Sequence, residues 1–280
     1  MDKKEGSITI NDKTYYYLAD GEYDAIVMGT GIKECILSGL LSAHGWKVLT
    51  IDRNRDYGEE CATYHLSDLY EKFKGEKPSD SVIAKFGKDR DYNVDVIPKF
   101  LMACGKLVKM LLKTRTTVYM SFSSIEGSFV YNGKKKNVSK MPATASEALS
   151  TPLLGMIQKV KYRSFVTNLV NMEIPGDDGV AEDADVPLNH MTMNELFDQY
   201  GLDDNCRDFT GHAMALKLND DYLEEPATET VRAIKLYGYS LSQYGSSPFI
   251  YPQYGLSNLP EGFARSASVH GGVFMMNRYI

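Results

Sequence analysis

The chain has 280 residues, of which 43% are hydrophobic and 24% are charged, and this is enough to bury one large core or two modest ones. A formal net charge of −6 argues against nucleic acid as a partner, because phosphates require a basic surface. Its apolar runs are too short for a bilayer-spanning helix and its N-terminus is charged and rich in tyrosine, so a membrane span and a signal peptide are excluded and a cytoplasmic location is expected.

Residues 1–21 form an N-terminal extension without a strong hydrophobic period, in which residues 15–18 could be a short strand or an ordered arm. A βαβ unit follows. Residues 23–28 are apolar and β-branched and end at Gly29-Thr30-Gly31, residues 32–43 have a helical apolar face, and residues 47–51 predict a second strand. The two strands of such a unit are expected to be parallel and adjacent.

Beyond this unit the pattern becomes charged, and it predicts a short helix over residues 66–73 followed by a loop. From Asp95 apolar residues recur at steps of three and four up to Leu111, which predicts a helix capped by Asp95 with Pro98 in its first turn. Residues 129–131 and 137–138 flank Asn132-Gly133 and predict a β-hairpin.

After residue 142 the pattern is helical almost throughout. Helices are expected over residues 146–161, 165–172, 192–200, 203–218 and 225–244, and Thr192 with Glu195 forms a capping-box signature at the third of them. We therefore interpret residues 142–240 as a mainly α-helical domain II inserted into an α/β domain I, which comprises residues 22–141 and 241–280. The returning segment is expected to contain a helix over 260–268 and a strand over 273–276.

The βαβ unit carries a degenerate nucleotide loop at Gly29, Gly31 and Glu34. A strand, two glycines, a helix and Asp52 about twenty residues further on make up the skeleton of the dinucleotide-binding fingerprint. Glutamate stands in place of the third glycine, so a pyrophosphate would meet a carboxylate at the helix terminus, a repulsion of order 1 kcal/mol at a screened surface. Glu59 and Glu60 add two more carboxylates in the following segment, at positions where flavoproteins of this kind usually have glycines, and no FAD or NAD cofactor is expected.

Other sites of chemistry are not indicated by the sequence. The histidines lack metal-ligand spacing, the cysteines form no C-x-x-C pair, and the nucleophile and metalloprotease motifs are absent. The residues concerned are His44, His65, His190, His212, His270, Cys35, Cys61, Cys104 and Cys206. The sequence therefore favours a protein that is not an enzyme and holds no metal.

Several long segments resemble the Rab GDP-dissociation inhibitors, a family related to the Rab escort proteins. The resemblance extends over residues 23–278, and glutamate also stands at the third-glycine position in that family. The matching segments are residues 23–39, 91–102, 126–131, 209–216, 220–223 and 259–265.

The resemblance implies a fold and a function. The fold is an FAD/NAD(P)-binding-like, Rossmann-type, doubly wound α/β domain with the helical domain inserted in it. The function is to bind GDP-bound, geranylgeranylated Rab GTPases, to slow GDP release, and to carry these proteins between membrane and cytosol with transient membrane contact. Domain II is then expected to hide the prenyl lipids, with an adaptable wall formed by Met156, Met172, Met191, Met193 and Met214.

Two further sites follow from the resemblance. The Rab-binding platform comprises Tyr57, Asn258, Glu261, Arg265 and Met275, of which Asn258 and Glu261 stand where the family usually has an acid and a glutamine. A mobile effector loop for membrane recruitment comprises Gln243, Tyr244, Ser247 and Phe249, although arginine and tyrosine are commoner at the first and last of these positions.

Two alternative functions remain open from the sequence. One is an escort protein that presents unprenylated Rab for lipidation, although the longer insertions of that group are not seen. The other is an FAD-dependent oxidoreductase. Family members are also considerably longer than this chain, which stops within the returning α/β segment, so the sheet is expected to have an open edge.

Overall fold

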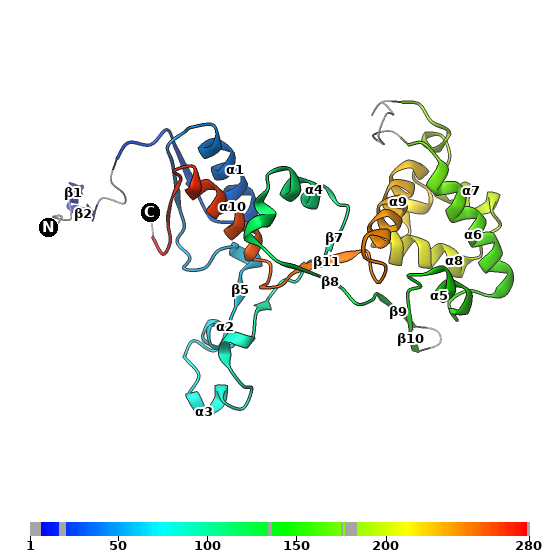
Figure 1. Ribbon diagram of the computed structural model, residues 1–280, viewed down its shortest axis with the longest axis horizontal. Coiled ribbons are helices and arrows are strands. Elements are labelled where there is room, and N and C mark those ends of the chain that lie inside the picture. The colour runs from blue at the N-terminus through cyan, green and yellow to red at the C-terminus, as the bar shows by residue number, and fades with distance from the viewer. Residues whose placement is uncertain (1–6, 17–20, 134–135, 175, 177–183, 279–280) are drawn as a thin grey trace. The chain divides into compact units, whose positions relative to one another are not determined.

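A computed structural model describes residues 7–16, 21–133, 136–174, 176 and 184–278. The chain forms two compact units (Figure 1). Unit 1 comprises residues 1–99, 111–122 and 252–280, and unit 2 comprises residues 100–110 and 123–251. Among the described residues, no helix combines the length and the apolar character needed to cross a membrane.

Unit 1 is built on a parallel sheet in the order β12-β4-β3. Strand β3 (Ala25–Met28), helix α1 (Ile32–Ala43) and strand β4 (Val48–Ile51) confirm the predicted βαβ unit. Helix α10 (Asn258–Val269) and strand β12 (Val273–Met275) confirm the predicted return, and β12 pairs with β4. All four residues of β4 are buried, since it is the central strand.

Helices α1 and α10 pack against each other and against the sheet (Figure 1). Gly39 faces α10, where a Cβ would lie 3.6 Å from the carbonyl oxygen of Phe263, an ordinary van der Waals distance. On the edge strand, Ile26 and Met28 are 62% and 71% exposed. Helices on both faces, as a doubly wound sheet requires, are therefore not seen in the part of the chain that the structure describes.

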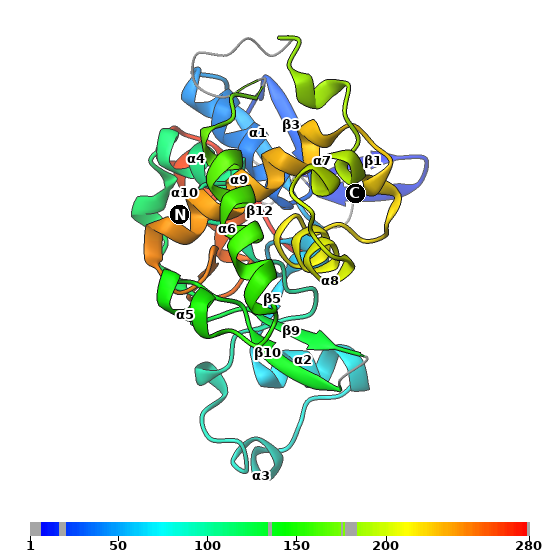
Figure 2. The same ribbon diagram turned by 90° about the vertical axis from the view of Figure 1, so that its right-hand side faces the viewer.

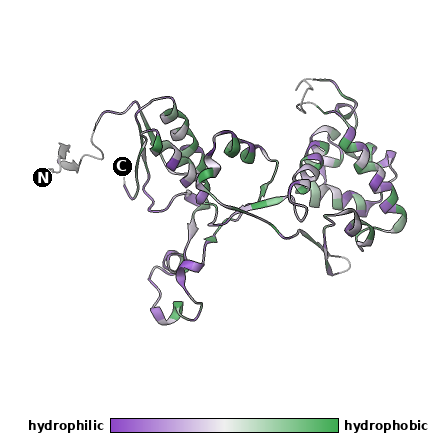
Figure 3. Ribbon diagram, in the orientation of Figure 1, coloured by the Kyte–Doolittle hydropathy of each residue, from purple (hydrophilic) through white to green (hydrophobic). Residues whose placement is uncertain are grey.

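The rest of unit 1 consists of short elements around this sheet. They are β1 (Ser7–Ile10), β2 (Lys13–Tyr16), η1 (Glu59–Cys61), β5 (Thr63–Tyr64), α2 (Leu66–Lys74), α3 (Asp80–Ile83), η2 (Asp89–Asp91), β6 (Val94–Asp95) and η3 (Thr116–Tyr119). The predicted helix near residue 66 is confirmed as α2, which is mostly hydrophilic (Figure 3). Within the extension, residues 15 and 16 belong to strand β2, which pairs antiparallel with β1. Residues 17–20 lie outside the described residues.

The helix predicted from Asp95 is wrong. Residues 94–95 form strand β6 and residues 101–102 form strand β7 (Leu101–Met102), and helix α4 (Lys106–Lys113) starts only at residue 106. The Asp95 carboxylate accepts a hydrogen bond from the Thr63 hydroxyl at 2.5 Å and another from the Leu256 amide at 3.0 Å. Asp95 thus joins β5 to a distant loop instead of capping a helix.

Unit 2 contains the larger helical part. Its strands are β7, β8 (Phe122–Ser124), β9 (Phe129–Asn132), β10 (Asn137–Lys140) and β11 (Phe249–Pro252); its helices are α5 (Ala145–Ser150), α6 (Met156–Asn171), η4 (Pro187–Asn189), α7 (Met193–Gln199), α8 (Asp204–Asp208), η5 (Phe209–Met214), η6 (Asp221–Leu223) and α9 (Ala227–Tyr244). Strands β9 and β10 confirm the predicted hairpin. The buried core of unit 2 includes Phe165 of α6, Phe197 of α7 and Tyr222 of η6. Helices α6, α7 and α9 are labelled in Figure 2.

Three predicted helices of unit 2 have other boundaries. The helix expected over residues 165–172 is not separate, because α6 runs unbroken from residue 156 to residue 171. The segment 146–161 is divided into α5 and α6, because Pro152 disfavours helical backbone at Thr151 and residues 151–155 form a break. The segment 203–218 is a short α-helix followed by the π-helical turn η5, and Leu216 has a positive φ of 56°. The capping box of Thr192 and Glu195 is present at α7 as predicted.

Candidate functional site

A cleft of about 1020 Å³ opens in unit 1 at the carboxyl ends of β3 and β4, where parallel sheets bind ligands. Charged side chains dominate its wall. They are Asp52, Arg53, Arg55, Asp56, Glu59, Glu60, Asp68, Glu71, Lys72 and Arg278. The degenerate nucleotide loop borders this cleft through Gly29.

Two carboxylates occupy the space in front of the glycine loop. A Cβ added to Gly29 would overlap the Glu59 carboxylate, and one added to Gly31 would lie 2.5 Å from Glu34 Oε2 and 3.1 Å from Glu59 Oε2. Glu34 lies in the first turn of α1, where free backbone amides would otherwise face a phosphate. The side chains therefore stand where a pyrophosphate would be held.

Both carboxylate oxygens of Asp52 already accept hydrogen bonds from within the protein. The Thr30 hydroxyl donates to Asp52 Oδ2 at 2.5 Å, and the Asn54 amide donates to Asp52 Oδ1 at 2.7 Å. Asp52 is buried, with 3% of its surface exposed. Its carboxylate therefore stabilises the conformation of the loop.

The electrostatics of the cleft also oppose an anionic ligand. Burial, followed by the charges of Glu34 and Asp52, raises the pKa of Glu59 above its ordinary value. The neighbouring Cys35 thiol, buried behind the loop, has its pKa raised to about 12 by burial and then by these same carboxylates. The residues present do not fit a bound dinucleotide, because its diphosphate would add negative charge to a site where the negative charge of Glu59 is already disfavoured.

The predicted platform residues lie in unit 1, and three of them are on α10. Asn258, Glu261 and Arg265 follow each other at spacings of three and four, which places them on one face of the helix. Burial raises the pKa of Glu261. Hydrogen bonds from the Ser257 and Asn258 side chains act in the opposite direction and lower that pKa in part. Its charge also acts on Tyr57, whose pKa is raised mainly by burial. Tyr57 and Glu261 therefore belong to one local group.

The other platform residues are placed beside this group. Arg265 is exposed and its guanidinium lies 5.4 Å from the ring centre of Tyr119 in η3. Met275 is half-buried at the end of β12, opposite Ile51 of β4. Phe274, the residue before it, packs its ring against Tyr57 at 6.1 Å.

The predicted effector-loop residues lie at the end of α9 and in β11. Gln243 and Tyr244 form the last turn of α9, which Gly245 ends with a φ of 73°. Ser247 is buried, and Phe249 pairs with Met102 in the sheet β7-β11-β8. Only the first two of the four residues project from the fold.

Unit 2 contains a second, mainly apolar groove of about 970 Å³. Its wall comes from β9, the end of β10 and the segment from α8 through η5, and it includes Phe129, Met141, Leu153, Phe209 and Leu216. The five methionines proposed as a lipid wall do not border it. Met193 and Met214 are buried in the core and Met156 is exposed. Helical spacing alone does not reveal which face of a helix meets the groove.

The π-helical turn η5 supplies one side of this groove, a feature that sequence patterning missed. A Cβ on Gly211 would overlap the hydroxyl of Tyr222, which donates to the Arg207 carbonyl at 3.2 Å. His212 contacts the Lys217 carbonyl at 2.8 Å, and this contact raises its pKa above the ordinary value. Such turns are enriched at functional sites.

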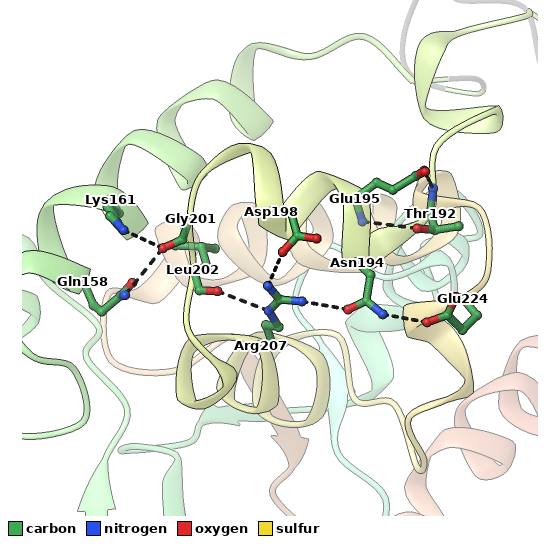
Figure 4. Close-up of polar contacts among 10 residues, drawn as sticks. All are labelled: Gln158, Lys161, Thr192, Asn194, Glu195, Asp198, Gly201, Leu202, Arg207 and Glu224. Atoms are coloured by element: carbon green, nitrogen blue, oxygen red, sulfur yellow. Dashed lines mark hydrogen bonds and ion pairs between the residues drawn. The ribbon is translucent and has the colours of Figure 1, made fainter.

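Arg207 of α8 connects α7, α8 and the loop between them (Figure 4). Its guanidinium donates to Asn194 at 2.9 Å, to Asp198 at 2.5 Å and to the Leu202 carbonyl at 3.2 Å. Only 20% of the side chain is exposed, so these bonds fix α7 against α8. Its role is structural, since it holds the wall of the groove in place.

The fold belongs to a class that includes cofactor-binding oxidases. A putrescine oxidase variant from a study of cofactor binding superposes with a TM-score of 0.52 at 12% identity, over 91% of this chain and 50% of the oxidase. At that identity the likeness concerns the fold alone. The chain is thus an FAD-binding-like α/β protein.

The chain belongs to the GDP dissociation inhibitor family, whose model matches residues 19–280. It is 48% identical over 262 residues to Rab GDP dissociation inhibitor beta of Rattus norvegicus, and 46% identical over 259 residues to the Rab GDP-dissociation inhibitor of Saccharomyces cerevisiae. A crystal structure of RAB GDI from Plasmodium falciparum superposes with a TM-score of 0.78 at 44% identity.

These relatives are longer than the chain. The alignments cover 92% of this chain with 57% of the rat protein and 56% of the yeast protein, and the Plasmodium structure aligns with 91% of this chain and 57% of its own. The chain therefore spans a little over half the length of the curated relatives it matches.

Proposed function

We propose that the protein binds GDP-bound, geranylgeranylated Rab GTPases, slows GDP release, and moves them between membrane and cytosol without catalysing a reaction. Membership of the GDP dissociation inhibitor family carries the proposal, because relatives named for this activity are 44–48% identical to the chain. A cytoplasmic protein with transient membrane contact fits this role.

The cleft of unit 1 supports binding over catalysis. Its glycine loop faces Glu34 and Glu59, and Asp52 is satisfied by internal donors. A flavin-dependent reaction would need the space that these side chains occupy. The scaffold is then free to present its loops to a protein partner.

We place the Rab platform on α10 and the loop after β4. Arg265 offers five donors on the exposed side of the helix, and such a fork can hold a carboxylate or carbonyl of a switch region. Tyr57 and Met275 are half-buried and would contribute apolar area beside it. Asn258 and Glu261 lie on the same face of α10.

We place the prenyl lipid in unit 2. We propose that this unit contains the helical domain II, inserted into a doubly wound domain I. Exposing a C20 chain costs about 0.8 kcal/mol per CH₂, so a carrier must supply apolar surface. The groove beside η5 has this character and a volume at the upper end of the usual range for ligand pockets. Gln243 and Tyr244 at the end of α9 would assist membrane recruitment.

The test is binding to Rab with and without its lipid. Because the lipid adds buried apolar area, GDP-loaded prenylated Rab should bind at least tenfold more tightly than unprenylated Rab. An escort protein would bind both forms comparably, so equal affinities would favour that alternative. A flavin released on denaturation would favour the oxidoreductase.

Arg265→Ala tests the platform. We expect at least a tenfold loss of affinity for prenylated Rab, as for a central arginine of an interface, with no unfolding. Arg90→Ala, a change at an exposed arginine of η2, is the matched control. Equal affinities of the Arg265 variant and the wild type would show that the platform lies elsewhere.

A further inference from the structure

Four large apolar side chains are exposed together on α5 and α6. Leu149 of α5 is 69% exposed, and Met156, Ile157 and Val160 of α6 are 79%, 74% and 72% exposed. They are not among the residues that line the groove of unit 2. We call these four side chains the α5–α6 patch.

The patch follows from the way α6 is built. Phe165 and Leu169 are fully buried and fix the inner face of the helix, and at 100° per residue Met156 and Val160 then point outward one turn apart. The Lys159 ammonium donates to the Leu149 carbonyl at 2.5 Å, which brings α5 beside the first turn of α6. The four apolar side chains are therefore exposed on two elements that this hydrogen bond joins.

Basic residues border the α5–α6 patch. By helical spacing, Lys159 and Arg163 lie along one side of the apolar stripe and Lys161 along the other. Lys159 and Lys161 are half-buried and donate to the carbonyls of Leu149 and Gly201, so Arg163 is the most accessible of the three charges. The sequence of α6 contains no aspartate or glutamate, although the whole chain has a net charge of −6. Positive charge is thus concentrated around the exposed apolar residues, and Arg163 is itself exposed.

We propose that the α5–α6 patch docks onto the surface of anionic lipid bilayers. Apolar residues bordered by lysine and arginine are the pattern of a helix that lies in the membrane interface, where the long basic side chains reach the headgroups. The charge of the helix complements phosphatidylserine-rich surfaces. The proposal rests on the proposed function in one respect, because a protein that extracts lipidated GTPases must approach a membrane.

Vesicle co-sedimentation tests the proposal. The wild-type protein is expected to bind vesicles of phosphatidylcholine mixed with phosphatidylserine more tightly than vesicles of phosphatidylcholine alone. Arg163→Glu should lower binding to the mixed vesicles by roughly 20-fold, since each basic charge near the surface contributes about a fivefold factor. Lys85→Glu, at an exposed lysine of unit 1, makes the same change in net charge and should leave binding unchanged.

The apolar part is tested with the double variant Ile157→Gln and Val160→Gln, which preserves helix propensity. Removing two aliphatic side chains that would be buried in the bilayer on binding should lower vesicle binding at least tenfold. Leu218→Gln is the control, because Leu218 is a fully exposed leucine of the same unit outside the α5–α6 patch. Wild-type vesicle binding by the double variant, or no binding by the wild type, overturns the proposal.

Fluorescence gives an independent readout. With the single native tryptophan removed by Trp46→Phe, Ile157→Trp should shift its emission to the blue when phosphatidylserine vesicles are added, and Leu218→Trp should not. An unshifted Ile157→Trp spectrum overturns the proposal.

Rab affinity, measured in parallel without membranes, separates the two claims. Vesicle binding that depends on the patch, in a protein that ignores prenylated Rab, supports the membrane surface and refutes the proposed function. Loss of Rab binding with unchanged vesicle binding makes the patch a Rab contact and overturns the membrane proposal.

Discussion

Removing the charge of Glu59 should stabilise unit 1. A Cβ built on Gly31 would lie 2.5 Å from Glu34 Oε2 and 3.1 Å from Glu59 Oε2, so these two carboxylates are near each other, and the charge of Asp52 also acts on Glu59. Two like charges about 4–6 Å apart repel by roughly 0.7–1 kcal/mol at the dielectric constant of water. Because Glu59 is exposed, this screened value applies, and Glu59→Gln should raise the free energy of unfolding by about 1 kcal/mol at neutral pH and low salt.

The pH dependence of this gain has a definite sign. The pKa of Glu59 is raised in the folded state, so its protonated carboxyl contributes stability below the ordinary glutamate pKa of about 4.3, and that contribution is lost as pH rises through the folded pKa. Glu59→Gln should therefore stabilise the protein at neutral pH and bring no gain in acid. Added salt should reduce the gain as well.

Urea unfolding followed by tryptophan fluorescence suits this measurement, because the single tryptophan, Trp46, lies in unit 1 and reports on that unit. Glu76→Gln, an exposed change outside the cleft, provides the control for a simple loss of charge. An unfolding midpoint at low salt that is the same in the Glu59 variant and the wild type would refute the reasoning, as would a gain that persists in acid.

Three further outcomes are expected in unit 2. Arg207→Ala should lower the free energy of unfolding by roughly 2–3 kcal/mol, since it removes three hydrogen bonds, whereas Arg232→Ala, at an exposed pair, should cost less than about 1 kcal/mol in the same urea titration. Thr192→Ala should lower the free energy of unfolding by about 1 kcal/mol, as measured by circular dichroism melting. Thr192→Ser should retain most of that stability, because the cap needs only the hydroxyl. Equal melting temperatures of the two variants would contradict this. The raised pKa of His212, caused first by its bond to the Lys217 carbonyl, means that stability is lost as pH rises through that pKa; His212→Gln should flatten the profile, and an unaltered slope would argue against the contact.

The α/β part of the fold could be predicted because its signals are local. Residues 25–51 alternate strand, glycine turn and helix, and the structure has all three elements in place. The helix expected from Asp95 failed for a physical reason, since apolar residues at steps of three and four fit two short strands and a shorter helix equally well when Asp95 is held by Thr63.

The candidate site was predictable only in part. Glu34 was visible because it replaces a glycine within the fingerprint, but the position of Glu59 over Gly29 depends on the path of the loop after β4. The groove in unit 2 depends on the π-helical turn and on Leu216 at positive φ, and no sequence period encodes either of them. The five methionines do not line this groove, and the lipid wall predicted from their spacing stays a prediction.

The most direct test of the account is the rate at which a prenylated Rab releases a fluorescent GDP analogue into excess unlabelled GDP. With saturating amounts of this protein, the account predicts a clearly slower release than from the Rab alone. An unchanged release rate, with protein shown to be folded by circular dichroism, would contradict it.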